Sequence, residues 1–161
     1  LTSLSLTYVD NLVRYLAFPA LSNLRQLELK VHAHNGDSLL YVTSLIDASP
    51  LLYKFVLQLL WLDNPLAEKR RVQKVKKHPH CCLKVVELIE FAGCSTDIEL
   101  AKYLLKNASS LEKITINPRP TLRFDFMTIE DFKKILEKDA TRERARQLRE
   151  DLPPGAELFT L

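Results

Sequence analysis

The chain has 161 residues, of which 47% are hydrophobic and 27% charged, which suits one globular domain or an end piece of a repeat array and excludes wholesale disorder. Its formal net charge of +3 is too mild to indicate a nucleic-acid-binding protein by itself. The 3 glycines form no glycine-rich phosphate-binding motif, and the 3 cysteines are too few for a disulfide scaffold.

The sequence shows no export or membrane signal. Its longest apolar stretch, residues 51–62, is interrupted by Lys54 and Gln58, so we expect no membrane-spanning helix. No charged start precedes an apolar core and a small-residue cleavage site. Together with the sparse cysteines, this predicts a cytoplasmic and/or nuclear protein. Because the chain starts with Leu1 rather than Met, we expect it to be a fragment or the C-terminal portion of a longer protein.

An internal repeat runs along the chain. Four segments share the pattern L-x-x-φ-x-φ, where φ is apolar, and they begin at residues 24, 52, 83 and 111. The intervals are 28, 31 and 28 residues. Alternating apolar residues at the end of each segment predict a short strand with one buried face. Leu4 and Leu6 suggest an earlier strand, whose register the pattern leaves open.

Amphipathic helices are expected between these strands. Asp37 can cap a helix over residues 39–46, and Thr96 with Glu99 forms a capping box before an apolar stripe over residues 98–108. One strand and one helix in about 28 residues is the leucine-rich-repeat (LRR) unit, which buries its apolar face only against neighbouring units. The predicted fold class is therefore α/β, a solenoid of parallel strands that alternate with helices.

A doubly wound α/β sheet is the alternative, because strands and helices alternate there too. Its strands are buried on both faces and read as continuous apolar runs. The strands of this chain carry Glu28, Lys54, Glu87 and Lys113 at alternate positions, which favours a sheet with one open face.

The period ends after Ile116. Residues 117–120 predict a loop, Thr128–Asp131 a helix start, and the charged stretch 139–151 a helix that residues 152–155 terminate. Residues 157–161 can add a last strand. A terminal repeat closes the stack with a polar outer surface, so we expect this tail to form a C-terminal cap.

Several segments resemble the FBD domain of plant F-box proteins. They are CLKVVEL (82–88), FAG (91–93), ELAKYLLKNA (99–108), LEKITI (111–116) and LPPGAEL (152–158). Residues 24–62 resemble the LRRs that precede this domain. The resemblance divides the chain into LRRs over 1–77, with a basic insertion near 63–77, and FBD-type repeats and cap over 78–161, in one continuous solenoid.

The resemblance implies the substrate-recognition end of an F-box protein. Such proteins dock on a cullin-type (SCF) ubiquitin ligase through an N-terminal F-box, and no F-box is present in this sequence. The ligase connection is therefore implied by the resemblance alone. One alternative is a scaffold or binding fragment without a ligase link; another is a nucleic-acid contact through the basic segment 69–77.

The open sheet face is the first candidate site, since a broad sheet of this kind suits binding an extended protein surface. The pattern places these side chains on it: Gln26, Glu28, Lys30, Lys54, Val56, Gln58, Val85, Glu87, Ile89, Lys113, Thr115 and Asn117. Val56, Val85 and Ile89 would form an apolar spot on this face. Some of these residues could instead face the helices of the tail.

The second candidate is a basic patch between the second and third repeats. It comprises Lys69, Arg70, Arg71, Lys74, Lys76 and Lys77. Such a run can contact phosphates or serve as a nuclear import signal. No aromatic residue is interleaved, as single-strand binders usually require, so a solvated insertion loop is the expectation and no nucleic-acid partner is predicted.

Metal-capable side chains occur in His78-Pro79-His80-Cys81-Cys82 and at Cys94. Their spacing fits no zinc motif, because there is no CxxC pair and no second cluster, so no metal or other cofactor is predicted. The adjacent cysteines should point one to the core and one to the surface. No nucleophile with a base and an orienting group can be assembled, so we predict no enzyme and no catalytic residue.

Overall fold

The computed structural model describes residues 2–9, 20–34, 36–62, 71–72, 74, 77–118 and 140–161. Its sheet has six strands in the order β1-β2-β3-β4-β5-β6, and every neighbouring pair is parallel. The strands are β1 (Ser3–Val9), β2 (Gln26–Ala33), β3 (Lys54–Trp61), β4 (Val85–Phe91), β5 (Lys113–Pro118) and β6 (Glu157–Thr160). The helices are η2 (Leu40–Val42), α1 (Thr43–Asp47), α2 (Ser95–Asn107) and η3 (Leu148–Asp151), and residues 140–147 are also helical.

The strands pair in the register that the repeat predicts. Leu27, Phe55, Val86 and Ile114 stand side by side in β2 to β5. Leu4 of β1 and Leu158 of β6 extend the same row at its two ends. The segments beginning at residues 24, 52, 83 and 111 are therefore consecutive parallel neighbours, as predicted.

The same backbone hydrogen bonds recur at the start of each repeat. The carbonyl of Arg25 accepts from Tyr53 and Lys54, at 2.7 and 2.9 Å. The carbonyl of Tyr53 accepts hydrogen bonds from the main-chain N–H groups of Lys84 and Val85, where β4 begins. The carbonyl of Lys84 accepts the corresponding bonds from Glu112 and Lys113, where β5 begins. Each of these carbonyls belongs to the residue that follows the first leucine of a repeat. The same position of the motif therefore aligns each strand with the next.

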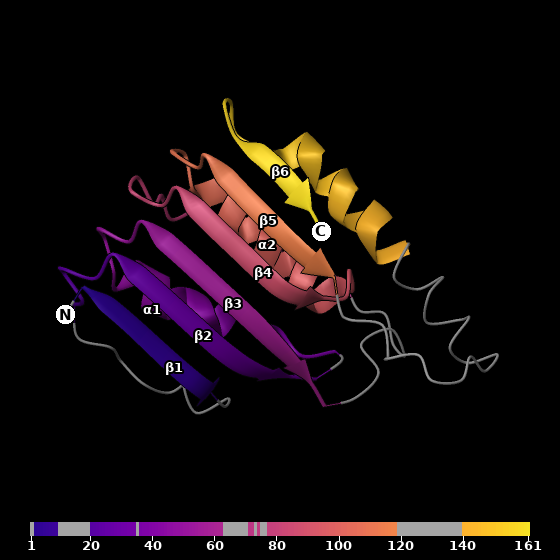
Figure 1. Ribbon diagram of the computed structural model, residues 1–161, viewed down its shortest axis with the longest axis horizontal. Helices are drawn as coiled ribbons and strands as arrows, with labels where there is room; N and C mark the ends of the chain where they lie inside the picture. The colour runs from indigo at the N-terminus through magenta and orange to yellow at the C-terminus, as the bar shows by residue number, and fades with distance from the viewer. Residues whose placement is uncertain are drawn as a thin grey trace.

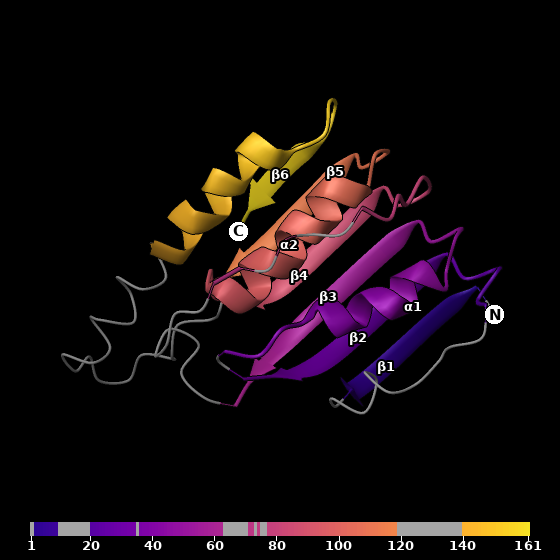
Figure 2. The same ribbon diagram turned by 180° about the vertical axis from the view of Figure 1, so that it is seen from behind.

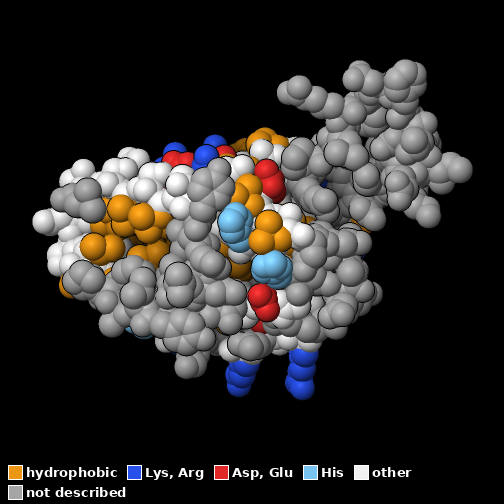
Figure 3. All heavy atoms as spheres, turned by 90° about the horizontal axis from the view of Figure 1, so that it is seen from below, with side chains coloured by type: hydrophobic (Ala, Val, Ile, Leu, Met, Phe, Trp, Pro, Cys, Tyr) orange, Lys and Arg blue, Asp and Glu red, His pale blue; other side chains and the backbone are white. Residues whose placement is uncertain are grey.

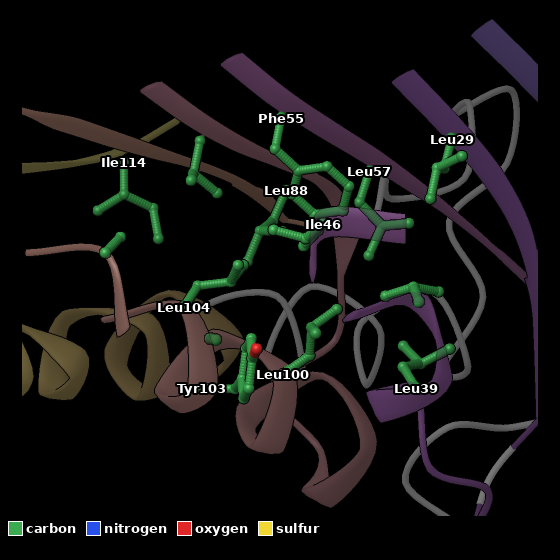
Figure 4. Packing of buried hydrophobic residues seen from close by; sticks show 14 of the residues in the cluster. Leu29, Leu39, Ile46, Phe55, Leu57, Leu88, Leu100, Tyr103, Leu104 and Ile114 are labelled. Atoms are coloured by element: carbon green, nitrogen blue, oxygen red, sulfur yellow. The ribbon is translucent and has the colours of Figure 1, made fainter. Parts of the chain in front are cut away.

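The core lies between the sheet and the helices behind it. Figure 4 shows strand residues Leu29, Phe55, Leu57 and Ile114 on one side and helix residues such as Leu104 on the other. The leading leucines 24, 52, 83 and 111 are buried as well. Because each inward side chain packs against neighbouring strands and helices, one core runs through all the repeats.

The described helices cover only one face of the sheet. Figure 1 shows the open face toward the viewer with α1 and α2 behind it, and Figure 2 shows both helices and residues 140–147 in front of the sheet. The strand order contains no reversal. A doubly wound sheet reverses its order and carries helices on both faces, so the described architecture fits the predicted LRR-type fold and not this alternative. No helix in the described ranges is long and apolar enough to span a membrane.

The predicted helix starts are wrong in detail. Asp37 caps no helix: the first turn is η2, and α1 begins only at Thr43 without a side-chain cap. The capping box of Thr96 and Glu99 does not form, because α2 already begins at Ser95 with Cys94 at the N-cap position. Glu99 instead accepts a 2.5 Å hydrogen bond from Ser38. Tertiary contacts thus replace the local caps that the sequence pattern predicted.

The tail follows its prediction only in part. Asn117 and Pro118 belong to β5 rather than to a loop, because β5 continues to pair with β4. The helix over residues 140–147, its end in η3 and the last strand β6 agree with the prediction. The helix start expected at Thr128–Asp131 lies outside the described residues.

Candidate functional site

The open face carries three rows of outward side chains. The first row is Ser3, Gln26, Lys54, Val85, Lys113 and Glu157. The second is Ser5, Glu28, Val56, Glu87, Thr115 and Phe159. The third is Lys30, Gln58, Ile89 and Asn117. All the outward positions that the sequence predicted thus lie together on one face, since strand side chains alternate between the two faces.

The centre of the open face is apolar and its surroundings are charged. Val56 lies diagonally between Val85 and Ile89 of the next strand, and all three side chains are half-buried. Glu28 and Glu87 flank Val56 on β2 and β4. At the β6 edge the Lys113 ammonium lies 4.9 Å from the centre of the Phe159 ring, which is 42% exposed. A surface of this kind offers both apolar and charged contacts to a partner.

At the carboxyl ends of the strands, side chains of β3 bond to Glu90 of β4. Glu90 has a positive φ of 63°, at the point where the pairing of β4 with β5 shifts. Its carbonyl accepts a 2.9 Å hydrogen bond from the Trp61 indole, and its carboxylate accepts a 3.3 Å bond from Gln58. These contacts join β3 to β4 beside Ile89 and order this end of the face.

The helix over residues 140–147 packs behind the sheet, away from the open face. Thr141 donates a 2.9 Å hydrogen bond to the Ala92 carbonyl, and Arg144 donates to the same oxygen at 3.4 Å. A Cβ at Gly93 would lie 3.1 Å from the Arg144 side chain, so the helix approaches this turn closely. Among the described elements, none lies over the open face of β3 and β4 (Figure 1).

The basic patch is described only in part. Lys69, Arg70 and Lys76 lie outside the described residues. Arg71, Lys74 and Lys77 are exposed and belong to no helix or strand. Their exposure agrees with a solvated segment and also leaves them accessible to an anion.

The structure assembles a polar cluster that the sequence pattern did not predict. His78 Nδ1 lies 3.2 Å, and His80 Nε2 3.3 Å, from Oδ1 of Asp47 at the end of α1. The Tyr103 hydroxyl of α2 donates a 3.0 Å hydrogen bond to the same oxygen and lies 3.0 Å from His80 Nε2. Asp47 precedes β3, whereas His78 and His80 follow β3. No local sequence pattern therefore indicates that these residues lie close together.

Burial sets the protonation states in this cluster. It lowers the pKa of His80 below the ordinary 6.5, an effect that Asp47 opposes and His78 reinforces. The His80 imidazole is therefore neutral at pH 7. Burial, together with Asp47, raises the pKa of Tyr103, so its hydroxyl keeps its proton and remains a donor.

The cysteines provide no reactive thiol in the core. Cys81 is exposed and Cys82 half-buried, so the expectation that one of the pair enters the core is wrong; both precede β4 instead of starting it. Cys94 is buried, and its burial raises the pKa of the thiol to about 11. A thiol of this kind stays protonated at neutral pH and is a weak nucleophile.

The surface also presents polar groups at its edge. Seen from below, histidine side chains lie near acidic and hydrophobic side chains, and lysine or arginine side chains extend outward (Figure 3). The described side chains on this side of the molecule are therefore mixed in charge.

The repeat architecture agrees with a comparison of the sequence with known families. A family model described as "At1g61320/AtMIF1, LRR domain" matches residues 3–147. The chain belongs to this family. No curated protein and no solved structure matches the chain significantly. The match covers β1 to β5 and the helix over residues 140–147, and it ends before β6.

Membership in the At1g61320/AtMIF1 LRR family identifies a leucine-rich-repeat region of plant type. The parallel six-stranded sheet fits the α/β fold of such a region. LRR domains generally act as non-catalytic interaction modules, which agrees with a broad outward-facing sheet.

Proposed function

We propose that this LRR domain binds a protein partner through the open face of its sheet, without catalysis. The observation that carries the proposal is the register, which gathers Val56, Val85 and Ile89 into one apolar spot within charged rows. Flat, mixed surfaces with an apolar centre are typical of protein interfaces. The chain would contribute recognition, and any activity would reside in a partner or in another part of the protein.

A finer proposal concerns the ubiquitin system. We infer that the partner is a substrate which an F-box protein presents to a cullin-type ligase, and that the strands form a solenoid with an FBD-type C-terminal cap. The support is the resemblance of residues 82–116 and 152–158 to the FBD domain. Under this proposal the LRRs over 1–77 and the FBD-type repeats over 78–161 act as one recognition unit in the cytoplasm or nucleus.

Two alternatives remain distinct from the ligase proposal. A scaffold without a ligase link would use the same face but would lack an F-box in the full gene product. A nucleic-acid contact would use the basic patch, of which Arg71, Lys74 and Lys77 are exposed. Its binding would fall steeply with salt, because phosphate contacts release counterions.

The open face is tested by capturing partners from plant cell extract with the wild-type chain and with Val56→Glu/Ile89→Glu. We expect partners to be lost from the double variant, because charge would replace the apolar centre. Lys102→Glu, on the exposed side of α2, is the matched control and should retain them. Equal capture by all three proteins would contradict the proposal.

Two further measurements separate the alternatives. Reading the gene upstream of Leu1 tests the ligase link, since an F-box there would support it and its absence would remove it. Salt-dependent binding of the chain to a nucleic-acid duplex, abolished by Lys69→Ala/Arg70→Ala/Arg71→Ala, would support the nucleic-acid alternative.

A further inference from the structure

Three metal-capable side chains converge where the connection between β3 and β4 meets the helices. In each neighbouring repeat a described helix covers the sheet, whereas the described residues 77–84 of this connection form no helix. They bring His78 and His80 to the carboxylate of Asp47. The ligand atoms of all three side chains lie within 4.8 Å of one another.

The end of α2 holds the two histidines in place. The main-chain N–H of His78 donates a 2.6 Å hydrogen bond to the side-chain oxygen of Asn107. The N–H of His80 donates a 2.8 Å bond to the carbonyl of the same residue. Because Asn107 also donates to the Tyr103 carbonyl at 2.9 Å, its side chain is fixed from both ends. The backbone that carries both imidazoles is thus ordered before any ligand binds.

The carboxylate is oriented by a neighbour that is no ligand. The Tyr103 hydroxyl donates to Oδ1 of Asp47 at 3.0 Å. Hydrogen bonds of this type fix the orientation of metal-binding carboxylates and contribute to metal affinity. The cluster therefore contains a group that could act in the second coordination shell.

The distances fit a small tetrahedral ion. Bonds of about 2.0–2.1 Å to a tetrahedral zinc ion place neighbouring ligand atoms about 3.3–3.4 Å apart. His78 Nδ1 and His80 Nε2 lie 3.2 and 3.3 Å from the Asp47 oxygen. The His78 side chain is 56% exposed, so it has room to rotate and reduce the remaining separation between the imidazoles. Asp47 is 34% exposed, so an ion can reach the site from solvent.

We propose that Asp47, His78 and His80 form a binding site for one divalent first-row transition-metal ion, with Zn²⁺ as the best match. Two imidazole nitrogens and one carboxylate oxygen are a ligand set that zinc uses in proteins. The bound ion would join the end of α1 to the connection between β3 and β4. It would thereby tie two neighbouring repeats together.

The proposal is tested by isothermal titration of the chelator-treated chain with Zn²⁺, together with thermal unfolding. We expect one ion per chain and a melting temperature that rises with zinc. His78→Gln should weaken binding at least about tenfold and abolish the thermal shift. The main-chain bond of His78 to Asn107 does not depend on its imidazole, so this variant should fold; Asp47→Asn provides a second test.

Two controls isolate the site. His34→Gln alters an exposed histidine after β2 and should bind zinc as the wild type does. Cys81→Ser/Cys82→Ser should also retain zinc, because the proposal assigns no thiolate ligand. With Co²⁺ as the probe, we expect weak visible bands and no near-ultraviolet thiolate-to-cobalt band.

Three results would overturn the proposal. The first is absence of stoichiometric zinc binding to the wild type. The second is unchanged affinity in both folded variants, His78→Gln and Asp47→Asn, as judged by circular dichroism. The third is binding that disappears in the double cysteine variant, since this would assign the metal to the thiols.

Discussion

Asp97 is the acidic residue in the first turn of α2. Its carboxylate accepts hydrogen bonds from the main-chain N–H groups of Ala92 and Gly93, at 2.6 and 3.1 Å. The side chain is almost fully buried, and its second oxygen, Oδ1, has no hydrogen-bond partner among the described residues. Burial outweighs these hydrogen bonds and the contacts with Cys94, and it raises the pKa of Asp97 to about 6.

This pKa makes the stability of the fold depend on pH. The folded state holds the Asp97 proton up to about pH 6, whereas the ordinary value is 3.8, so the stabilisation is complete below 3.8 and is lost as pH rises through 6. The loss is on the order of 3 kcal/mol. Urea unfolding of the wild type and Asp97→Asn at pH 4 and pH 7 measures it.

The difference in unfolding free energy between the wild type and Asp97→Asn separates the effect of Asp97 from that of the other carboxylates. Asparagine keeps an oxygen that can accept both main-chain bonds and does not titrate. We expect the wild type to lose stability relative to Asp97→Asn between pH 4 and pH 7. A constant difference across this range would show that burial does not control the Asp97 proton.

Among the elements, β4 separates the two faces of the sheet most clearly. Val86 is fully buried between Phe55 and Ile114, whereas Glu87 points to the open face beside Val56 and Thr115. The two positions are adjacent in sequence and differ only in the face they occupy. They therefore form a matched pair for testing which face of the sheet each side chain occupies.

Val86→Asp should unfold the neighbouring repeats, because it places an unpaired charge in the core at a cost of more than about 4 kcal/mol. Glu87→Lys should cost less than about 1 kcal/mol, since the side chain reaches solvent. Urea denaturation followed by circular dichroism measures both. A large loss of stability in Glu87→Lys would contradict its outward assignment.

Across the whole molecule, the repeats share one core from β1 to β6. Leu158 of β6 is buried at one end of the row that begins with Leu4. The single tryptophan, Trp61, lies at the end of β3 and bonds to Glu90 of β4. Its fluorescence thus reports on the middle of the sheet, whereas circular dichroism reports on all the elements.

Leu158→Ala should lower stability by about 2–3 kcal/mol, because it leaves a cavity in the core behind β6. If the repeats unfold together, Trp61 fluorescence and circular dichroism will shift to the same urea midpoint. Phe159→Ala, on the opposite face of β6, is the control and should change the midpoint little. If Leu158→Ala leaves the urea midpoint of Trp61 fluorescence unchanged, the repeats unfold separately.

The strand register and the outward rows could be predicted from the sequence alone. Both depend on the alternation of side chains along an extended backbone, which is a local property that Phe55 or Val86 shows within its own strand. The recurring leucines then set which strands are neighbours. For this reason the predicted outward residues, including Gln58, Val85 and Thr115, share one face of the sheet.

Only the tertiary structure decided how the segments between the strands meet. It replaced the predicted caps of α1 and α2 with contacts such as Ser38 to Glu99, and it placed helix 140–147 behind the sheet. It also brought Asp47 to His78 and His80. Such proximity depends on the path of the connection after β3, and no local periodicity records that path.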